Sequence, residues 1–301
     1  MTQNKPSAFV LVGPTASGKS AVAQWLAERT GAPIVSADSM NIYRRMDIGT
    51  AKPSLAERTR VKTFGIDLAD PTELFSVGDW LNAVRPAFDT TQTSIVAGGT
   101  GLYVRCLLQG LDDVPTADEE LRERAEKMPL AELQAEAQQA APEAYAALAD
   151  KENPRRLIRL LEGRKTADSW KSEMPVVIGL HVEREVLHQR IAERVTKMYA
   201  GGLLEEARGL ADRKLSSTAQ HAIGYAEAFA VLRGEMTKAQ AMEKTIARTR
   251  QLSKRQMTWF RHQLNVQWIE TSDYPNVGKL ADKVYNACKE SGPVPLAGVC
   301  L

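Results

Sequence analysis

One short motif constrains this chain more than any other feature. Gly13-x-x-x-x-Gly18-Lys19-Ser20 follows an apolar run at 8–12 and precedes a helical pattern at 21–29. A glycine-rich turn between a strand and a helix aims backbone N–H groups at one point, where the helix dipole adds positive charge. Lysine then neutralises phosphate charge and the serine hydroxyl helps to hold Mg²⁺. The candidate diphosphate-binding residues are Gly13, Pro14, Thr15, Ala16, Ser17, Gly18, Lys19 and Ser20.

The loop predicts a diphosphate site without identifying the diphosphate, because nucleotide kinases and GTPases use the same device. Further apolar runs at 33–36, 94–97 and 176–182 are separated by segments of helix length. This spacing predicts a parallel sheet joined by crossover helices. The expected fold class is therefore α/β, with a P-loop NTPase-like parallel sheet and flanking helices.

The chain between 112 and 175 differs from the rest, since it is rich in Ala, Glu, Gln and Leu and has no strand signal. It predicts a helical insertion domain, in which Pro154 suits the first turn of a helix. Residues 1–111 and 176–301 would then form the catalytic core. After 182 the pattern is again helical, with breaks expected at Gly201-Gly202 and near Ser216, and a short strand at 266–269.

Composition limits the classes of protein. The 39 basic and 37 acidic side chains leave a net charge of +2, so any nucleic-acid site must be a local patch. Cys106, Cys288 and Cys300 lack CxxC spacing and are expected to be reduced thiols. The chain shows no apolar signal region and no long apolar span. A cytoplasmic location without membrane contact is expected.

Two further turns follow predicted strands, at the sheet edge where open α/β sheets bind ligands. Asp38 can therefore face the phosphate loop, where a carboxylate could bind Mg²⁺, take a proton from a substrate, or cap a following helix. Gly98-Gly-Thr-Gly101 lets a substrate or backbone come close, or is plain turn geometry. The residues alone leave both choices open.

A basic segment lies near the C-terminal end of the helical region. It contains Lys244, Arg248, Arg250, Lys254, Arg255 and Arg261, no acidic residue, and Gln256, Trp259 and Phe260 among them. A merely solvated helix face usually mixes charge signs. A cationic face beside aromatic groups suits polyphosphate, or RNA backbone with an exposed base. The four histidines show no metal-ligand spacing.

Several segments together resemble the tRNA dimethylallyltransferase (isopentenyltransferase) family. They are 13–20, 38–43, 46–53, 96–103, 155–159, 223–225 and 249–261, in family order. The resemblance implies Mg²⁺-dependent transfer of a dimethylallyl group from dimethylallyl diphosphate to N6 of the adenosine 3′-adjacent to the tRNA anticodon. The tRNAs are expected to read codons beginning with U. ATP would be neither cofactor nor product, and a monomer is expected.

The resemblance also implies roles for single residues. Asp38 is expected to be the general base, with Lys19 and Thr100 as the other catalytic residues and Ser20 as the metal ligand. The insertion domain is expected to contact the anticodon stem-loop. The expected tRNA-binding residues are Asp38, Ser39, Met40, Asn41, Thr100, Arg122, Arg155, Arg156, Leu157, Ile158, Arg159, His221, Arg248, Gln251, Lys254, Arg255, Gln256, Trp259 and Arg261. His221 stands where many relatives have arginine, a departure from the family pattern.

Two other classes share some of these features. A small-molecule or nucleotide kinase would share the sheet, Lys19 and the helical insertion, but a small acceptor does not need so extensive a basic and aromatic helix. An RNA-binding protein could keep the loop as a structural anion site without catalysis. The intact Lys19, Ser20 and Asp38 argue against that alternative.

Overall fold

The computed structural model describes residues 6–89, 92–111, 119–148, 150–163 and 174–299. The chain divides into two compact units. The core unit comprises Met1–Gly110 and Met174–Leu301, and the insertion unit is Leu111–Glu173. These divisions fall within two residues of the boundaries expected from composition.

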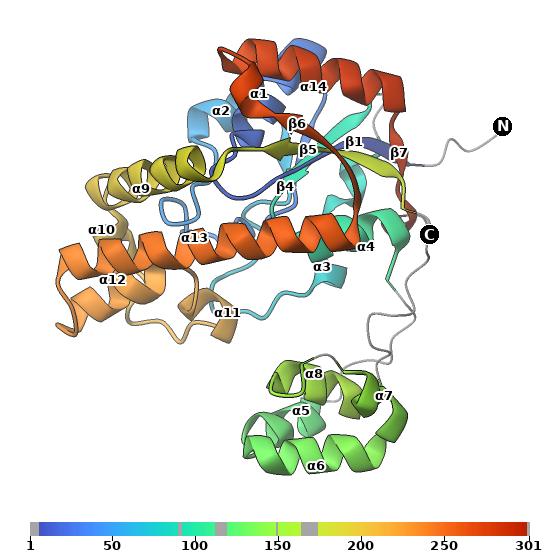
Figure 1. Ribbon diagram of the computed structural model, residues 1–301. Coiled ribbons are helices and arrows are strands. Elements are labelled where there is room, and N and C mark those ends of the chain that lie inside the picture. Colours follow the sequence, from blue (N-terminus) through green and yellow to red (C-terminus); the bar gives the residue numbers. More distant parts are fainter. Residues whose placement is uncertain (1–5, 90–91, 112–118, 149, 164–173, 300–301) are drawn as a thin grey trace. The chain divides into compact units, whose positions relative to one another are not determined.

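A mostly parallel sheet forms the centre of the core unit (Figure 1). The strands are β1 Ser7–Val12, β2 Ile34–Ser36, β3 Thr63–Phe64, β4 Ser94–Gly98, β5 Val176–His181 and β6 Asn265–Glu270, in the order β3-β2-β4-β1-β5-β6. The short strand β7, Val294–Pro295, pairs antiparallel with β1. The predicted α/β class is confirmed. The two-residue strands β3 and β7 were not predicted, because two residues are too few to show a strand pattern.

Helices cover both faces of the sheet (Figure 1). On one face, α1 Lys19–Thr30 and α14 Val277–Ser291 bury an apolar core against β1, β4 and β5. On the other lie α3 Val77–Val84, α4 Gly101–Gln109 and part of α13 Lys238–Gln263. The small helix α2, Leu55–Arg60, starts at a capping box between Ser54 and Glu57. Short 3-10 helices lie at Arg85–Ala87, Thr271–Asp273 and Ala297–Val299.

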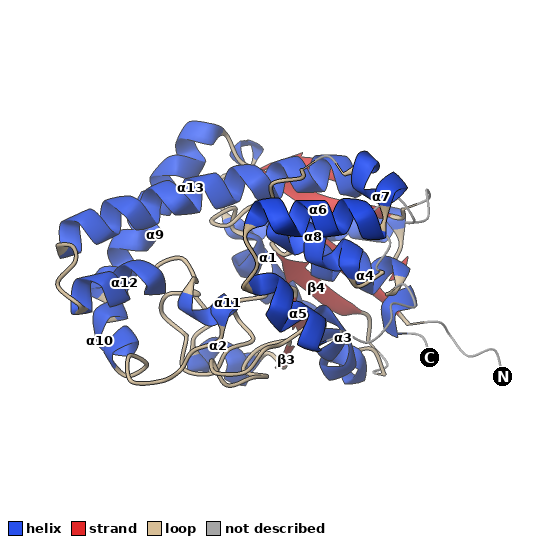
Figure 2. Cartoon of the chain, turned by 90° about the horizontal axis from the view of Figure 1, so that it is seen from below, coloured by secondary structure: helices blue, strands red, loops and turns tan. Residues whose placement is uncertain are grey.

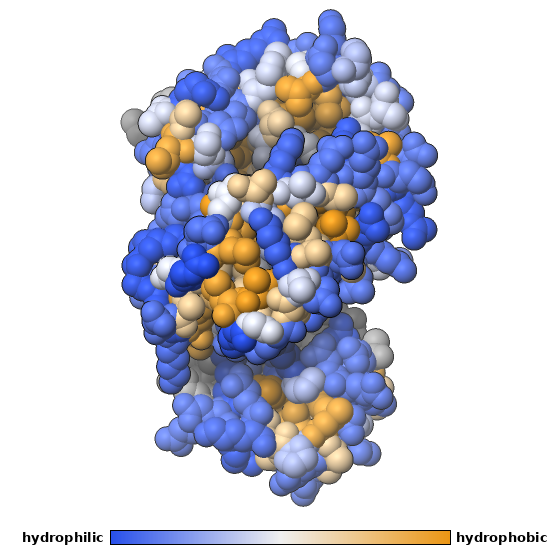
Figure 3. Space-filling view, turned by 90° about the vertical axis from the view of Figure 1, so that its left-hand side faces the viewer, coloured by the Kyte–Doolittle hydropathy of each residue, from blue (hydrophilic) through white to orange (hydrophobic). Residues whose placement is uncertain are grey.

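A second group of helices gathers at one end of the sheet (Figures 1 and 2). It contains α9 Arg184–Ala200, α10 Leu203–Arg208, α11 Ser217–Gln220, α12 Tyr225–Leu232 and the N-terminal part of α13. The predicted breaks are confirmed: Gly202 has a left-handed φ of 101°, and Ser216 caps α11. On the face where α9, α10 and α12 lie, polar side chains cover most of the surface and apolar ones show between them (Figure 3).

The insertion unit is helical, as composition predicted. Its helices are α5 Glu119–Glu126, α6 Leu130–Ala140, α7 Pro142–Ala147 and α8 Pro154–Leu161. Asn153 caps α8 and Pro154 occupies its first turn. The unit has its own apolar core, which includes Leu157 and Ile158, exposed by 0% and 5%. These two side chains pack inside the unit, so only their backbone could reach a ligand, and the expected contact of this segment with tRNA stays a prediction.

No helix in the described part of the chain is long and apolar enough to cross a membrane. Cys106 and Cys288 are buried free thiols, as expected, while Cys300 lies outside the described residues. Burial raises the pKa of the Cys288 thiol to about 12, so this sulfur is a poor nucleophile at neutral pH.

Candidate active site

The phosphate loop leaves the carboxyl end of β1 and enters α1. Gly18 has a left-handed φ of 92°, which glycine adopts without strain, and α1 begins at Lys19. The Lys19 ammonium donates to the Pro14 carbonyl oxygen at 3.2 Å. The Ser17 hydroxyl is buried and has no hydrogen-bond partner among the described residues. A buried hydroxyl in such a loop is available to a ligand that supplies the missing acceptor.

Lys19 is only 9% exposed, and this burial lowers the pKa of its ammonium to about 8. The nearby Asp38 carboxylate opposes the shift, and the Arg194 guanidinium adds to it. A buried cation repelled by a second cation gains strongly from an anionic ligand. The electrostatics therefore favour a multiply charged anion beside Lys19.

Arg194, on α9, is the second cation of this site and was missed in the sequence. Its pKa is lowered by burial, and Asp38 again opposes the shift. Its one hydrogen-bond partner among the described residues is the Thr50 carbonyl oxygen, at 3.3 Å. Neither Arg194 nor Lys19 forms an ion pair with another described residue, so both cations remain available to an anion.

A signal for Arg194 is present in the sequence. The apolar residues of α9 include Leu187, Ile191 and Met198, all buried. Arg194 lies three residues after Ile191 and four before Met198, so it falls on the same stripe of the helix. A cation on an apolar stripe needs a partner, and that need marks it as a candidate ligand contact.

Asp38 lies beyond β2, beside the turn that follows β4. The register pairs Ser36 with Ala97, so β2 and β4 end at the same edge of the sheet. One Asp38 carboxylate oxygen accepts from the Met40 N–H at 2.9 Å, and the other has no hydrogen-bond partner among the described residues. No helix starts after Asp38 before α2 at Leu55, so the helix-cap alternative is wrong. A carboxylate with one open oxygen can accept a proton.

Thr100 holds the Asp38 turn from the neighbouring strand. Its hydroxyl oxygen accepts from the Ser39 N–H at 2.9 Å and lies 3.2 Å from the Ser39 hydroxyl. Its own N–H donates to the Ala37 carbonyl oxygen at 3.0 Å. Thr100 thus fixes the backbone on both sides of Asp38, whereas its expected contact to tRNA stays a prediction.

The glycines of the β4 turn let the chain approach closely, which decides the alternative left open by the sequence. A Cβ on Gly98 would lie 2.1 Å from the Ala37 carbonyl oxygen. On Gly101 it would lie 2.1 Å from the Trp259 ring of α13. Between them, Gln256 donates to the Gly99 carbonyl oxygen at 3.0 Å and accepts from the Thr15 N–H at 2.8 Å. Helix α13 therefore packs directly on both turns of the site.

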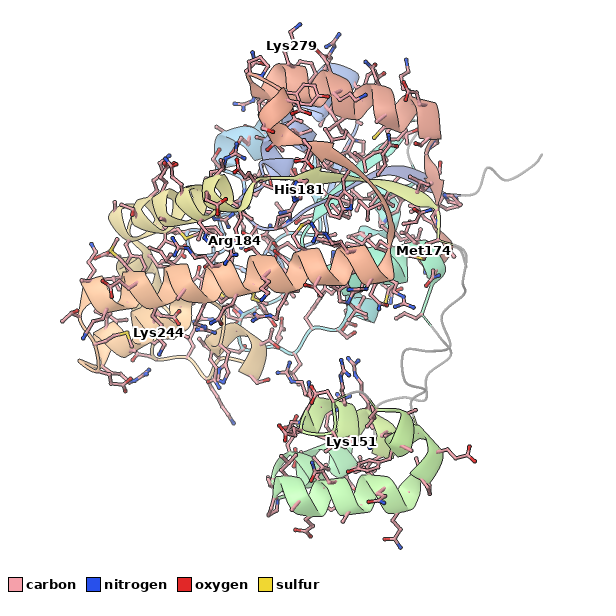
Figure 4. The ribbon with its side chains drawn as sticks, in the orientation of Figure 1. Lys151, Met174, His181, Arg184, Lys244 and Lys279 are labelled. Carbon is pink, nitrogen blue, oxygen red and sulfur yellow. The ribbon has the colours of Figure 1, made fainter. Side chains whose placement is uncertain are left out.

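The predicted cationic face of α13 is confirmed as an exposed surface. Its exposed basic residues are Lys244, Arg250, Lys254, Arg255 and Arg261, and Gln251 is exposed among them. Lys244 marks the N-terminal part of this face in Figure 4. Trp259 is half-buried against Gly101. We refer to these five basic residues as the α13 cationic face.

Arg248 differs from its neighbours on α13. Its guanidinium pairs with the buried carboxylate of Glu227 and donates to the His221 carbonyl oxygen at 3.1 Å. Arg248 therefore neutralises a buried carboxylate, and because its side chain is still 33% exposed, its expected contact with tRNA stays a prediction. His221 itself is exposed at the end of α11.

The expected tRNA-binding arginines of the insertion unit fall into two groups. Arg155, Arg156 and Arg159 of α8 are exposed. Arg122 of α5 instead pairs with Glu162 at 2.8 Å, and the Glu162 side chain is 2% exposed. Arg122 therefore neutralises a buried carboxylate within the unit.

The residues present fit Mg²⁺ bound together with a diphosphate. The Ser20 side chain is exposed in the first turn of α1, directly after Lys19. The described residues hold no cluster of three or more His, Cys, Asp or Glu that could bind a metal alone. Mg²⁺ favours sites in which substrate phosphates supply several ligands, so Ser20 and the substrate would share the ion.

A separate apolar cavity lies on the face of the sheet that α1 and α14 cover, opposite to α4 and α13. Its volume is about 240 Å³, and Phe9, Leu11 and Ile95 meet Val284 and Cys288 there. These residues belong to the core between the sheet and α1 and α14. The cavity has no charged lining residue and is not part of the phosphate site.

The fold and the site together define an α/β phosphate-loop enzyme in which a buried lysine and a half-buried arginine lie beside a carboxylate, and a basic helix packs against the loop. Comparison with known families then identifies the chain. The IPP transferase model matches residues 41–263, and the isopentenyl transferase model matches residues 6–66. The chain belongs to the IPP transferase family, and is thus a prenyltransferase. The resemblance seen in the sequence is confirmed, and the kinase and non-catalytic alternatives are wrong.

Relatives and solved structures agree with this assignment. The chain is 42% identical to tRNA dimethylallyltransferase 1 of Citrifermentans bemidjiense, over 89% of this chain and 93% of the relative. It is 41% identical to tRNA dimethylallyltransferase of Geobacter metallireducens, over 89% and 94%. The crystal structure of the Bacillus halodurans tRNA isopentenylpyrophosphate transferase matches with a TM-score of 0.69 at 34% identity, covering 95% of this chain and 98% of that one.

Proposed function

We propose that this enzyme transfers a dimethylallyl group from dimethylallyl diphosphate to N6 of the adenosine 3′-adjacent to the anticodon of tRNA. The observation that carries the proposal is the arrangement of the buried Lys19 and the half-buried Arg194, two cations without an ion-pair partner in the described chain, next to the open carboxylate oxygen of Asp38. The names of the relatives, tRNA dimethylallyltransferases, support the choice of substrates.

The positive charges of the site support binding of the prenyl donor through its diphosphate. Lys19, Arg194 and the Ser17 hydroxyl would bind the diphosphate, and Mg²⁺ at Ser20 would neutralise part of its charge. Negative charge grows on the diphosphate as the allylic C–O bond breaks. Fixed cations in a buried site stabilise that developing charge more than they stabilise the ground state. Catalysis on this side is leaving-group stabilisation.

The acceptor side uses Asp38. A neutral exocyclic amine is a poor nucleophile, but its protons become acidic as the new C–N bond forms. The open oxygen of Asp38 would take one of these protons, giving N6-(dimethylallyl)adenosine and diphosphate. The adenine must leave its stack to reach an allylic carbon, which costs only a few kcal/mol for a loop base.

The α13 cationic face supports binding of the tRNA backbone, and Trp259 offers a ring at its edge. Arg155, Arg156 and Arg159 of the insertion unit add three exposed cations suited to the anticodon stem-loop. Recognition of tRNAs that read codons beginning with U, and action as a monomer, belong to the same proposal.

The decisive experiment incubates the enzyme with unmodified tRNA, Mg²⁺ and labelled dimethylallyl diphosphate, followed by nucleoside analysis. We expect label in N6-(dimethylallyl)adenosine at the position after the anticodon, and none when the donor is omitted. A parallel reaction with ATP should show no phosphoryl transfer. Label at another position or in another nucleoside would overturn the proposal.

A further inference from the structure

The carboxylate of Glu206, on α10, binds three successive backbone N–H groups of a distant turn. It accepts from Asp47 and Ile48 at 3.0 Å and from Gly49 at 3.3 Å. Consecutive N–H groups that converge in this way form an anion-binding concavity, which here holds a side chain. Removing the charge would leave several donors in competition for one neutral acceptor.

Tyr225 completes this arrangement from α12. Its hydroxyl donates to the same Glu206 carboxylate, and its side chain is fully buried. Burial raises the pKa of the Tyr225 hydroxyl, so this group remains a donor. The ring lies so close to Gly49 that a Cβ there would be 2.4 Å from a ring carbon. Any other residue at 49 would push the turn away from Glu206.

The same turn carries the hydrogen-bond partner of Arg194. The Thr50 carbonyl, one residue after Gly49, accepts from the Arg194 guanidinium at 3.3 Å. Arg194 has no other hydrogen-bond partner among the described residues, and it faces Asp38 and Lys19. The position of the Thr50 carbonyl therefore decides where the guanidinium points.

We propose that Glu206, with Tyr225, is a positioning residue for the diphosphate site, which it controls through the 47–50 turn and Arg194. This inference rests on the proposed function in one respect, that the anion bound between Lys19 and Arg194 is a diphosphate. Glu206 does not touch the substrate. It holds the backbone that aims a cation at the leaving group, and a misplaced guanidinium loses much of its attraction for the anion.

The test uses Glu206→Gln, which keeps the size but removes the charge. We expect Mg²⁺-pyrophosphate to bind about tenfold more weakly, as for the loss of one charge-assisted contact, and the KM for the donor to rise in step. The affinity for tRNA should stay within a factor of about two. The matched control is Glu205→Gln on the same helix, whose side chain is exposed, and it should bind pyrophosphate like the wild type.

A double-mutant cycle separates positioning from general destabilisation. Glu206→Gln added to Arg194→Ala should weaken pyrophosphate binding by less than about twofold, because the residue through which it acts is gone. A full tenfold loss in both backgrounds would overturn the inference. Should Glu206→Gln fail to fold, Tyr225→Phe removes one donor from the carboxylate. Its smaller loss of affinity should likewise vanish in the Arg194→Ala background, and an undiminished loss there would overturn the inference.

The two proposals fail in different ways. A wild-type enzyme that binds pyrophosphate but transfers no prenyl group would overturn the proposed function and leave the role of Glu206 open to the same binding measurements. Prenyl transfer by a Glu206→Gln variant with unchanged pyrophosphate affinity and unchanged donor KM would overturn the role of Glu206 alone.

Discussion

The backbone N–H of Thr15 donates to the side-chain oxygen of Gln256 at 2.8 Å. The side-chain NH₂ of Gln256 donates in turn to the Gly99 carbonyl oxygen. One side chain of α13 therefore holds both the phosphate loop and the turn after β4. The exposed basic residues of the α13 cationic face lie on this same helix. A helix that contacts the phosphate loop on one side and presents cations on the other would join the proposed donor and tRNA sites in a single element.

Gln256→Leu should damage the donor site without removing any charge. The leucine fills the space but leaves the Thr15 N–H and the Gly99 carbonyl without their side-chain partner, which costs about 1–3 kcal/mol. We expect a lower Tm and weaker binding of Mg²⁺-pyrophosphate by calorimetry. Gln189→Leu, at an exposed position of α9, is the control and should change neither. A Gln256→Leu variant with wild-type Tm would show that the loop is held by other contacts.

Lys19→Met should stabilise the empty enzyme while abolishing donor binding. The folded pKa of Lys19 is about 8, below its ordinary value of 10.5. Between pH 8 and pH 10.5 the unfolded chain therefore binds more protons than the folded protein. The charged Lys19 thus lowers the free energy of unfolding below pH 8, and this destabilisation fades as the pH rises toward 10.5. At neutral pH the cost is on the order of 3 kcal/mol.

Thermal unfolding checks this prediction. At pH 7 the Lys19→Met variant should unfold at a higher temperature than the wild type, and the difference should shrink above pH 8. Pyrophosphate with Mg²⁺ should raise the Tm of the wild type only. A variant less stable than wild type at pH 7 would mean that Lys19 supports the empty loop.

Most of the fold could be predicted from the sequence, because strand patterns and the glycine turn depend on local residues. The loop, Asp38 and the basic helix are local signals of the same kind. Arg194 and Glu206 were not identified: a charged residue on the apolar stripe of a helix signals the need for a partner, but only the tertiary structure shows which group it faces. The burial of the Leu157 and Ile158 side chains was not predicted, because the segment 155–159 contains both surface and core positions.

Pyrophosphate affinity should fall as pH rises above about 8. The bound anion raises the pKa of Lys19, so binding takes up a proton wherever the free enzyme has lost it. Below pH 7 Lys19 is already charged and contributes no uptake. Calorimetry in two buffers of different ionisation enthalpy measures the protons taken up. In the Lys19→Arg variant the side chain stays charged at every pH, so its proton uptake on binding reports the protons that pyrophosphate itself takes up. Equal uptake by both proteins at pH 8.5 would contradict the prediction.

Arg255→Ala should weaken tRNA binding and make its salt dependence shallower. When the protein makes one phosphate contact fewer, tRNA binding releases fewer counterions. The slope of the logarithm of the binding constant against the logarithm of the salt concentration should therefore decrease in magnitude by about 0.7 to 0.9. The control is Lys279→Ala on α14, on the opposite face of the sheet (Figure 4). Filter binding at four salt concentrations suffices. Parallel lines for Arg255→Ala and wild type would remove Arg255 from the tRNA contact.

Asp38→Asn separates proton transfer from binding. Asparagine has nearly the same size, and its carbonyl oxygen can still accept from the Met40 N–H, so the turn keeps its shape. It cannot take the proton of the attacking amine. We expect kcat to fall by about 10² to 10⁴, the usual range for a general base.

Pyrophosphate affinity should move in the other direction, because the negative charge of Asp38 faces the site of the diphosphate and its removal eliminates a repulsion. The result that identifies a general base is therefore a large loss of single-turnover rate together with equal or tighter binding of Mg²⁺-pyrophosphate and unchanged tRNA affinity. Asp38→Ala, which also removes the acceptor for Met40, serves as the comparison and should lose some tRNA affinity as well. An undiminished single-turnover rate for Asp38→Asn would make Asp38 a positioning group, and deprotonation would then fall to water or to the departing diphosphate.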